Sequence, residues 1–415
     1  MSRNHILFLS YDGMTDPLGQ SQVLPYLCGL SQLGYSFSLI SFEKPDRFQM
    51  GKQPIQQVCD QYGITWYPLN YTQRPPVIST LKDLLTLWKL VQTLQDTNPI
   101  ALVHCRSYIT SLIGLRIKKK WGVPFIFDMR GFWADERVDG KIWNLKNPLY
   151  HLIYRFFKKK ERQFIERADH TISLTEQAQS IIHDWARLKG QPVPITVIPC
   201  CVDLQHFDPS TITSDDKLNL RSRLNIPISA PILSYVGSIG TWYMLREMMA
   251  FFVRWLNKFP DSIFLFISQD DPSSILQQAA SFGVSVDKIR VCGANRSEMP
   301  LFISISDCSI FFIKPVFSKK ASSPTKHGEI MSMGVPVVCN NGVGDTDLVI
   351  RTWHSGLLVD RFSQENYDEV IDAFYRSNFD PVEIRNGAQD YFSLEEGVSR
   401  YKRVYEILLS ERQSD

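Results

Sequence analysis

Short apolar runs alternate with longer segments of helical period along the chain. In the longer segments, such as Ser21 to Leu33, Thr80 to Gln95 and Asn147 to Arg167, apolar residues recur three and four positions apart, as on one face of a helix. In the first half, the apolar runs that predict strands are His5 to Ser10, Ser36 to Phe42, Ala101 to Cys105, Phe125 to Asp128, His170 to Leu174 and Thr196 to Pro199. This alternation predicts a parallel sheet covered by helices on both faces.

The pattern pauses over Asp203 to Pro231, which is rich in Asp, Ser and Pro, and then starts again. A last segment, from Ser393 to Ser410, has the amphipathic period of a helix and a capping-box start. The strands predicted in the second half are Ile232 to Gly237, Ile263 to Ser268, Ile289 to Gly293, Cys308 to Ile313 and Val335 to Cys339. We therefore expect an α/β protein with two doubly wound, Rossmann-like domains joined near Pro209 to Asp216.

Composition narrows the class of protein. A chain of 415 residues can form two or three domains with cores of their own, and its net charge of +2 argues against a general nucleic-acid binder. The eight cysteines show no paired metal-binding spacing, and several lie in apolar runs, which favours reduced thiols and a cytoplasmic location. The sequence shows no positively charged and then apolar leader, so no signal peptide is predicted. No stretch approaches about 18 uninterrupted apolar residues, so no transmembrane helix is predicted.

The segment from Ser322 to Val338 carries the strongest chemical signal. It predicts a polar loop, a short helix, a Gly-Val-Pro turn and the start of a buried strand. Ser323 and Lys326 lie where the helix begins, and free N–H groups at a helix start favour an anion such as phosphate. Glu329 follows about one turn later, where a carboxylate can accept hydrogen bonds from the two hydroxyls of a ribose. Phosphate and ribose groups together indicate a nucleotide.

This segment resembles the family-four glycosyltransferases of the GT-B fold, which carry a helix with a Glu and then a Met-Ala-x-Gly-x-Pro-Val-Val run. Here that run is Glu329-Ile330-Met331-Ser332-Met333-Gly334-Val335-Pro336-Val337-Val338. Many members have two Glu flanking seven residues, and the first would fall at Ala321, so only the second is kept. Pro324, Lys326 and Glu329 match a sub-pattern of the family, Ser/Pro-x-Lys-x-x-Glu.

The resemblance covers most of the chain, in the family's order. Four further segments carry it: Ser10 to Ser21, Arg167 to Thr175, Val197 to Phe207 and Ser234 to Ser238. The resemblance implies two Rossmann-like domains facing across a cleft, with the last helix crossing back onto the first domain. The expected division is an acceptor-side domain of residues 1–208 completed by 393–415, and a nucleotide-sugar-binding domain of residues 209–392.

Two places in the first half are candidate sites. Gly19 and Gln20 end the first loop just before a helix, where a ligand could approach closely, although a plain strand–helix turn is the alternative. The resemblance places this loop over the active cleft. Arg130 occupies the position where many family members carry a His that faces the sugar. A guanidinium cannot act as a base but can hold phosphate or acceptor oxygens, and Asp128 would orient it. A structural ion pair at a strand end is the alternative.

The loop that opens the second domain departs from the family. Its members place an Arg and a Lys just after the Gly of this strand to bind the diphosphate, but here the sequence is Gly237-Ser238-Ile239-Gly240-Thr241-Trp242-Tyr243-Met244. We expect Gly237, Ser238 and Gly240 to supply backbone donors. Lys326 and Lys314 would supply charge, and Arg246 is an alternative.

No metal site is expected. Asp345 and Asp347 have the Asp-x-Asp spacing of a metal-binding motif in the other main glycosyltransferase fold, but they lie in a Gly-rich loop where Asp is favoured as a turn former or helix cap. No cofactor is expected either; the nucleotide sugar is the donor substrate, with a UDP-sugar as first choice and a GDP-sugar as second.

The block from Arg116 to Arg162 holds 13 Lys and Arg residues against five Asp and Glu. Its centres, Lys118 to Lys120 and Lys158 to Lys160, lie beside aromatic and aliphatic residues, a composition that suits an anionic membrane surface. Solvated helix faces with their apolar sides in the core are an equally good interpretation.

The sequence therefore predicts a glycosyltransferase that moves a sugar from a nucleoside diphosphate sugar to a hydroxyl of a glycan or lipid-linked glycan. The resemblance implies retention of anomeric configuration and no essential metal. The reduced cysteines and the basic clusters favour a cytoplasmic protein that can sit at the inner face of the membrane. Arg130, Asp128 and Lys326 are the expected catalytic residues. Two alternatives remain: a GT-B nucleotide-sugar epimerase, and an inactive nucleotide-binding scaffold subunit, since the usual Arg/Lys pair and the first Glu are missing.

Overall fold

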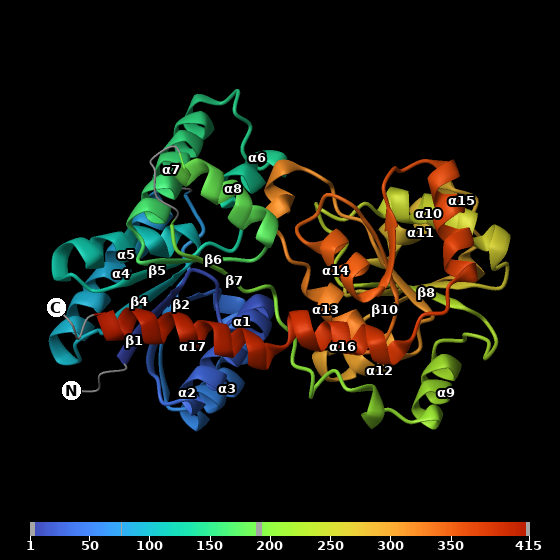
Figure 1. Ribbon diagram of the computed structural model, residues 1–415, viewed down its shortest axis with the longest axis horizontal. Coiled ribbons are helices and arrows are strands. Elements are labelled where there is room, and N and C mark those ends of the chain that lie inside the picture. Colours follow the sequence, from blue (N-terminus) through green and yellow to red (C-terminus); the bar gives the residue numbers. More distant parts are fainter. Residues whose placement is uncertain (1–4, 76, 188–192, 412–415) are drawn as a thin grey trace. The chain divides into compact units, whose positions relative to one another are not determined.

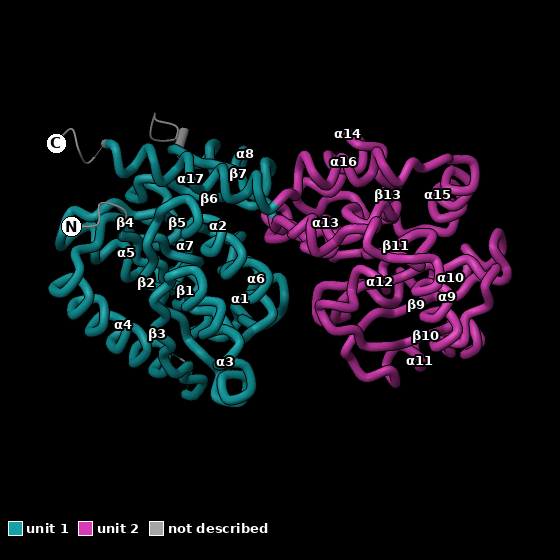
Figure 2. The backbone as a smooth tube through the Cα atoms, turned by 90° about the horizontal axis from the view of Figure 1, so that it is seen from below, with its two compact units in different colours: residues 1–199, 394–415 teal, residues 200–393 magenta. Residues whose placement is uncertain are grey.

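The computed structural model describes residues 5–75, 77–187 and 193–411 (Figure 1). The chain divides into two compact units, of which unit 1 comprises Met1–Pro199 and Leu394–Asp415, and unit 2 comprises Cys200–Ser393 (Figure 2). The expected domain boundary after residue 208 therefore lies a short way beyond the division after Pro199.

Unit 1 is built on a parallel sheet that has seven strands among the described residues, in the order β3-β2-β1-β4-β5-β6-β7. The strands are β1 (His5–Ser10), β2 (Ser36–Glu43), β3 (Ile64–Asn70), β4 (Leu102–Arg106), β5 (Phe125–Asp128), β6 (His170–Ser173) and β7 (Ile195–Val197). All residues of β1, β4 and β5 are buried, as expected for central strands covered by helices on both faces.

The helices of unit 1 lie on both sides of this sheet; in Figure 1, α7 and α17 are on opposite sides. They are α1 (Pro17–Gln22), α2 (Leu24–Gln32), α3 (Pro45–Gln61), α4 (Ile78–Thr97), α5 (Ser107–Trp121), α6 (Trp133–Asp139), α7 (Pro148–Arg167), α8 (Glu176–Arg187) and α17 (Leu394–Glu411). The C-terminal helix α17 packs on α2, and a Cβ atom at Gly29 would lie only 2.8 Å from Val398 Cγ2. The predicted return of the last helix to the first domain is therefore confirmed.

Unit 2 repeats the architecture with a parallel sheet of six strands among its described residues, in the order β10-β9-β8-β11-β12-β13. The strands are β8 (Ile232–Val236), β9 (Ile263–Ile267), β10 (Ile289–Cys292), β11 (Cys308–Phe311), β12 (Val337–Asn340) and β13 (Gly356–Val359). The α-helices are α9 (Ser214–Arg223), α10 (Leu245–Lys258), α11 (Pro272–Ser281), α12 (Met299–Ser304), α13 (Thr325–Ser332), α14 (Thr346–Trp353), α15 (Gln364–Arg376) and α16 (Pro381–Phe392). Short 3₁₀ turns are η1 (Pro209–Thr211), η2 (Val286–Lys288), η3 (Arg296–Glu298) and η4 (Phe317–Ala321).

Each sheet has one point where the strand order reverses, between β1 and β4 in unit 1 and between β8 and β11 in unit 2. Loops that leave the carboxyl ends of such strands in opposite directions open a crevice, which is where ligands of doubly wound folds bind. The doubly wound fold predicted from the apolar runs is thus confirmed, although β3 and β13 were not predicted.

Among the described residues, no helix is both long and apolar enough to cross a membrane.

Candidate active site

Lys326 and the loop after β8 meet at the reversal point of unit 2. Lys326 belongs to the first turn of α13, and its side chain is buried between two tyrosine rings, with Nζ 4.1 Å from the ring centre of Tyr235 and 3.6 Å from that of Tyr243. Nζ also donates a hydrogen bond to Tyr235 Oη at 3.1 Å. Burial lowers the pKa of Lys326 well below its usual value, and Glu329 and Asp270 oppose this shift.

Gly237 makes room for Lys326. Its φ of 97° lies in the region that favours glycine, and a Cβ atom there would approach Lys326 Nζ to 3.3 Å. Its own N–H donates to the carbonyl of Ile267 at 2.9 Å. Gly237 therefore leaves space for Lys326 because it has no side chain. Its backbone N–H was expected to be a donor to the diphosphate, but it is already hydrogen-bonded to Ile267.

Glu329 lies one turn further along α13, and its side chain is 12% exposed. Its Oε1 accepts a hydrogen bond from Arg296 of η3 at 3.4 Å. Burial raises the pKa of Glu329, whereas the charges of Arg296, Lys326 and His206 lower it. The sequence placed Lys326 and Glu329 together, but it did not reveal Arg296, which comes from a loop 33 positions away.

The remaining residues of the β8 loop are held by Asp270, which the sequence analysis did not assign to the donor site. The carboxylate of Asp270 accepts hydrogen bonds from Ser238 Oγ and from the N–H of Ile239. The carbonyl of Ser238 accepts a hydrogen bond from Tyr235 Oη. Gly240 has a φ of 30° and open space around a virtual Cβ, whose nearest neighbour is Ser238 Oγ at 3.9 Å. Asp270, which follows β9, thus orders the loop after β8.

Two lysines stack on the loop that lacks the family's basic pair. Lys319 of η4 lies over the ring of Trp242 at 3.8 Å, as Lys326 lies over that of Tyr243. Lys314 has an exposed side chain, and its backbone N–H bonds to the carbonyl of Trp242. Ser323 Oγ accepts a hydrogen bond from the N–H of Cys200 at 3.1 Å. Lys319 carries no local sequence signal, because its contact depends on tertiary structure.

In unit 1, the first loop is held by a carboxylate from β2. Glu43, 1% exposed, accepts hydrogen bonds from the N–H groups of Met14 and Thr15 and from Thr15 Oγ1. The prediction that Gly19 and Gln20 end this loop is wrong, because both lie inside α1, which begins at Pro17. From α1, Gly19 packs tightly against the loop, since a Cβ atom there would lie 2.2 Å from the carbonyl oxygen of Gly13. Gln20 is exposed, and its amide donates to the carbonyl of Thr15. Gly19 therefore allows the close packing of α1 on the loop, whereas Gln20 presents its side chain to solvent.

Three neighbouring strands of unit 1 end in polar residues at the same height. Ser10 of β1 is in register with Arg106 of β4, which is in register with Asp128 of β5. Arg106 is buried, and its Nε lies 3.3 Å from Oδ2 of Asp12, just beyond β1. Arg106 was not predicted, although a charged residue closing a buried strand is the same signal that identified Asp128.

Arg130 follows β5 in a strained backbone conformation. Its φ is 56°, a region that non-glycine residues adopt rarely and that is enriched at functional sites. Its NH1 lies 3.8 Å from Oδ1 of Asp128, and both side chains are largely buried. Ser107, directly after β4, has a φ of 69°, so the ends of two adjacent strands share this feature. The predicted pairing of Asp128 with Arg130 is therefore present.

The two basic clusters are only partly available to a ligand. Lys118 bonds to Asp169, and Lys158 bonds to Asp135 and to the buried Glu161. Lys120 lies over the rings of Trp88 and Trp121. Lys119 and Lys159 have exposed side chains. The outer face of α7 also exposes Leu149, Leu152 and Phe156, to 54%, 66% and 44%.

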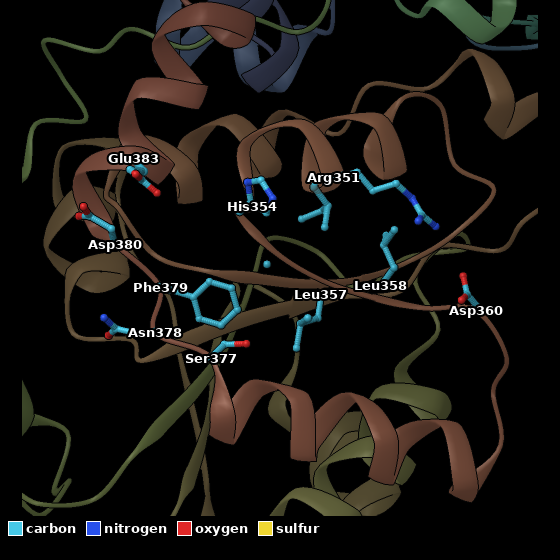
Figure 3. A pocket seen from close by; sticks show the side chains of 12 residues that line it. Arg351, His354, Leu357, Leu358, Asp360, Ser377, Asn378, Phe379, Asp380 and Glu383 are labelled. Carbon is cyan, nitrogen blue, oxygen red and sulfur yellow. The ribbon is translucent and has the colours of Figure 1, made fainter.

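Other candidate features lie elsewhere. Within residues 5–75, 77–187 and 193–411, no group of three or more His, Cys, Asp or Glu side chains is arranged to hold a metal ion. Asp345 accepts a hydrogen bond from Tyr391 instead. A pocket of about 720 Å³ lies at the edge strand β13 and is lined by residues such as Arg351, His354 and Asp360 (Figure 3). None of the predicted site residues lines this pocket.

The chain matches two family models. Residues 22–206 match Glycosyltransferase Family 4, and residues 216–391 match Glycosyl transferases group 1. The chain is 22% identical over 399 residues to the UDP-Gal:alpha-D-GlcNAc-diphosphoundecaprenol alpha-1,3-galactosyltransferase of Escherichia coli, an alignment that covers 92% of this chain and 95% of the relative.

Solved structures show the same fold. Sucrose-phosphate synthase from Thermosynechococcus elongatus superposes with a TM-score of 0.73 at 15% identity, covering 98% of this chain and 100% of that one. The Anabaena protein Alr3699/HepE in complex with UDP superposes with a TM-score of 0.70 at 14% identity, covering 97% and 99%. At these identities the likeness carries the fold alone.

Proposed function

The chain belongs to the group 1 glycosyltransferases of the GT-B fold, which use nucleotide-sugar donors, and from this we propose that it transfers a sugar from a UDP-sugar to a hydroxyl of a lipid-linked glycan. The observation that carries the proposal is the placement of Lys326 and Glu329 on one helix beside Gly237, at the strand reversal of unit 2. A cation and a carboxylate one helical turn apart fit the diphosphate and the ribose of a nucleotide.

Lys326 is proposed to stabilise the leaving diphosphate. Its ammonium is held between two aromatic rings and away from water, where a developing negative charge gains more from it than it would in solution. Lys319, stacked on the neighbouring Trp242, is a second cation of the same loop and a candidate for the role of the family's missing basic pair. Glu329 would accept hydrogen bonds from the ribose hydroxyls.

Arg130 is proposed to hold the reacting sugar or the acceptor from unit 1. A guanidinium has no lone pair to take a proton, so its role is to bind oxygen atoms and to stabilise charge. The reaction is proposed to proceed with retention and without an essential metal. The choice of UDP is supported by the UDP-Gal donor in the name of the Escherichia coli relative and by the UDP complex of the Anabaena protein.

A lipid-linked acceptor is supported by the diphosphoundecaprenol in the relative's name and by the surface of unit 1. On α7, Leu149, Leu152 and Phe156 form one exposed apolar stripe. Exposed Arg155 and Lys159 flank it. This combination suits insertion of apolar side chains into an anionic bilayer, with the basic residues at its headgroups.

A second stripe lies on α4, where Ile78, Leu81 and Leu85 are 65%, 56% and 61% exposed. Right-handed crossovers place α4, α5 and α7 on the same side of the sheet of unit 1, and the three helices begin at the carboxyl ends of their strands. Both stripes occupy the first halves of their helices, at the edge of the sheet where Arg106 and Arg130 lie. A membrane-bound acceptor would thus meet the protein near these residues.

The test is transfer itself. The purified protein is incubated with a panel of UDP- and GDP-sugars and a lipid-diphosphate sugar acceptor, and products are identified by mass spectrometry. We expect one UDP-sugar to extend the acceptor, and Arg130→Ala to abolish extension while nucleotide binding survives. Conversion of the nucleotide sugar without any acceptor would indicate an epimerase. Thermal stabilisation by a nucleotide without transfer to any acceptor, and without conversion of the nucleotide sugar, would indicate an inactive nucleotide-binding scaffold.

A further inference from the structure

Two buried tyrosines of the C-terminal helix reach the strand ends of unit 1. Tyr401 and Tyr405 lie one turn apart on α17 and are 4% and 0% exposed. Tyr401 Oη lies 3.2 Å from Oδ2 of Asp128, and Tyr405 Oη lies 2.7 Å from Nδ1 of His104. His104 in turn places Nε2 at 3.4 Å from the same Oδ2 of Asp128. One helix therefore contacts Asp128 both directly and through a histidine.

The partners assign the protons of this cluster. Asp128 is ionised, because burial alone would raise its pKa but Arg130, His104 and Arg106 outweigh burial and lower it. A carboxylate can only accept, so Nε2 of His104 and the Tyr401 hydroxyl are the donors. Burial lowers the pKa of His104, which keeps the ring neutral and leaves Nδ1 to accept from Tyr405. Hydrogen bonds thus run from Tyr405 through His104 to Asp128.

These donors leave one carboxylate oxygen for the arginine. Oδ2 of Asp128 receives Tyr401 and His104, whereas Oδ1 faces NH1 of Arg130 at 3.8 Å. Arg130 starts from a strained backbone position and is followed by Gly131 with a φ of 123°, so its side chain leaves the strand in a direction that few residues can adopt. The orientation of the Asp128 carboxylate therefore sets the direction in which its negative charge attracts the Arg130 guanidinium.

We propose that Tyr401 and Tyr405 are positioning residues for transfer, which hold Asp128 and His104 so that Asp128 directs Arg130 toward the reacting groups. This inference rests on the proposed role of Arg130 and extends the working site of unit 1 to the C-terminal helix. It gives the return of α17 to unit 1 a functional role in addition to its packing on α2.

The kinetic test removes single hydroxyl groups. Tyr401→Phe and Tyr405→Phe keep the rings, and Tyr35→Phe is the matched control, because the Tyr35 ring packs edge-on against Tyr405 at 5.3 Å and its hydroxyl is outside this chain of hydrogen bonds. We expect Tyr401→Phe to lower kcat by about tenfold to a hundredfold, the range for a hydrogen bond to a charged group. Tyr405→Phe should lower it less, because it acts through His104. The donor KM should stay within about twofold, and the control should behave as wild type.

A spectroscopic test is independent of activity. In ¹⁵N-labelled protein near pH 7, His104 should show the neutral tautomer protonated at Nε2, and Tyr405→Phe should shift the Nδ1 resonance toward that of an imidazole nitrogen without a donor partner. A charged His104, a proton on Nδ1, or a resonance that ignores Tyr405→Phe would overturn the inference.

The outcomes separate this inference from the function on which it rests. If Arg130→Ala is inactive while both Phe variants and their double variant keep wild-type kcat, the positioning role is refuted and the function stands. If Arg130→Ala keeps full activity, the role of Arg130 fails and the inference falls with it. If the wild-type protein transfers no sugar from any donor, the proposed function itself is refuted.

Discussion

The guanidinium of Arg296 lies 3.4 Å from the carboxylate of Glu329, which makes Arg296 a partner of the residue proposed to bind the donor ribose. Burial raises the pKa of Glu329, and the charge of Arg296 is the largest influence that lowers it. Arg296 therefore favours the ionised form of Glu329, which accepts hydrogen bonds from hydroxyl groups.

Glu329→Gln is expected to weaken nucleotide binding by about 1–3 kcal/mol, the scale of a hydrogen bond to a charged group. The amide keeps the size of the side chain but presents one acceptor oxygen instead of two. Isothermal titration calorimetry with UDP measures the change. Unchanged affinity would remove Glu329 from the nucleotide site.

Arg296→Gln is expected to make UDP binding sensitive to acid. Without the arginine, the pKa of Glu329 rises further, so the carboxylate is protonated at a higher pH and affinity is lost earlier as the pH falls. The other groups near Glu329 are Lys326, His206 and Tyr243. UDP affinity is measured from pH 5 to pH 8, and His206→Gln is the control for the other side chain whose charge acts on Glu329. A pH profile identical to that of the wild type would contradict this role of Arg296.

Lys326→Ala is expected to lower kcat by about a hundredfold, the effect of one lost donor at a site of developing charge. It should raise the donor KM much less, because the interaction strengthens as the diphosphate departs. Steady-state kinetics with the donor concentration varied measures both constants. Wild-type turnover in the variant would refute the assignment.

His327 gives the protein an acid-sensitive core. Its ring is fully buried, packs between Phe311 and Phe392, and burial lowers its pKa to about 3. Since the unfolded chain binds a proton near pH 6.5 and the folded one does not, stability is fully present above that pH. It falls by up to about 1.4 kcal/mol per pH unit between roughly pH 6.5 and pH 3. His327→Leu should reduce this slope in urea unfolding. An equal slope would show that other groups cause the acid sensitivity.

How far the sequence predicts this fold depends on burial. Central strands such as β1 and β5 are buried on both faces, so their sequences are largely apolar runs. These runs are the signal from which both strands were predicted. Strand β3 was missed because it lies at the edge of its sheet, mixes buried and exposed residues and contains Pro68. Strand β13 was missed because it is an edge strand of four residues that begins with a glycine.

The candidate site shows the same limit. Lys326 and Glu329 were predicted together because helical spacing alone places them on one face. Their partners Tyr235 and Arg296 come from other segments, and only the folded sheet brings them to α13. Local spacing thus predicts the pair on one helix, whereas the environment that sets their pKa values depends on tertiary structure.

The last prediction concerns the membrane. Leu152→Gln with Phe156→Gln should lower binding to anionic liposomes by tenfold or more, because burial of each side chain contributes about 1.5–3 kcal/mol. Arg155→Ser with Lys159→Ser should lower liposome binding to a similar extent at low salt, at about 1 kcal/mol for each charge. The difference from the wild type should shrink as salt is added.

Lys158 is kept in these variants, because its removal would leave the buried Glu161 without its ion pair. Ile228→Gln in unit 2 is the matched control, since Ile228 is 76% exposed and lies outside this face. Co-sedimentation measures binding. If all variants bind as the wild type does, or if neutral and anionic liposomes recover the protein equally, α7 is an ordinary solvated helix and a soluble acceptor becomes the better proposal.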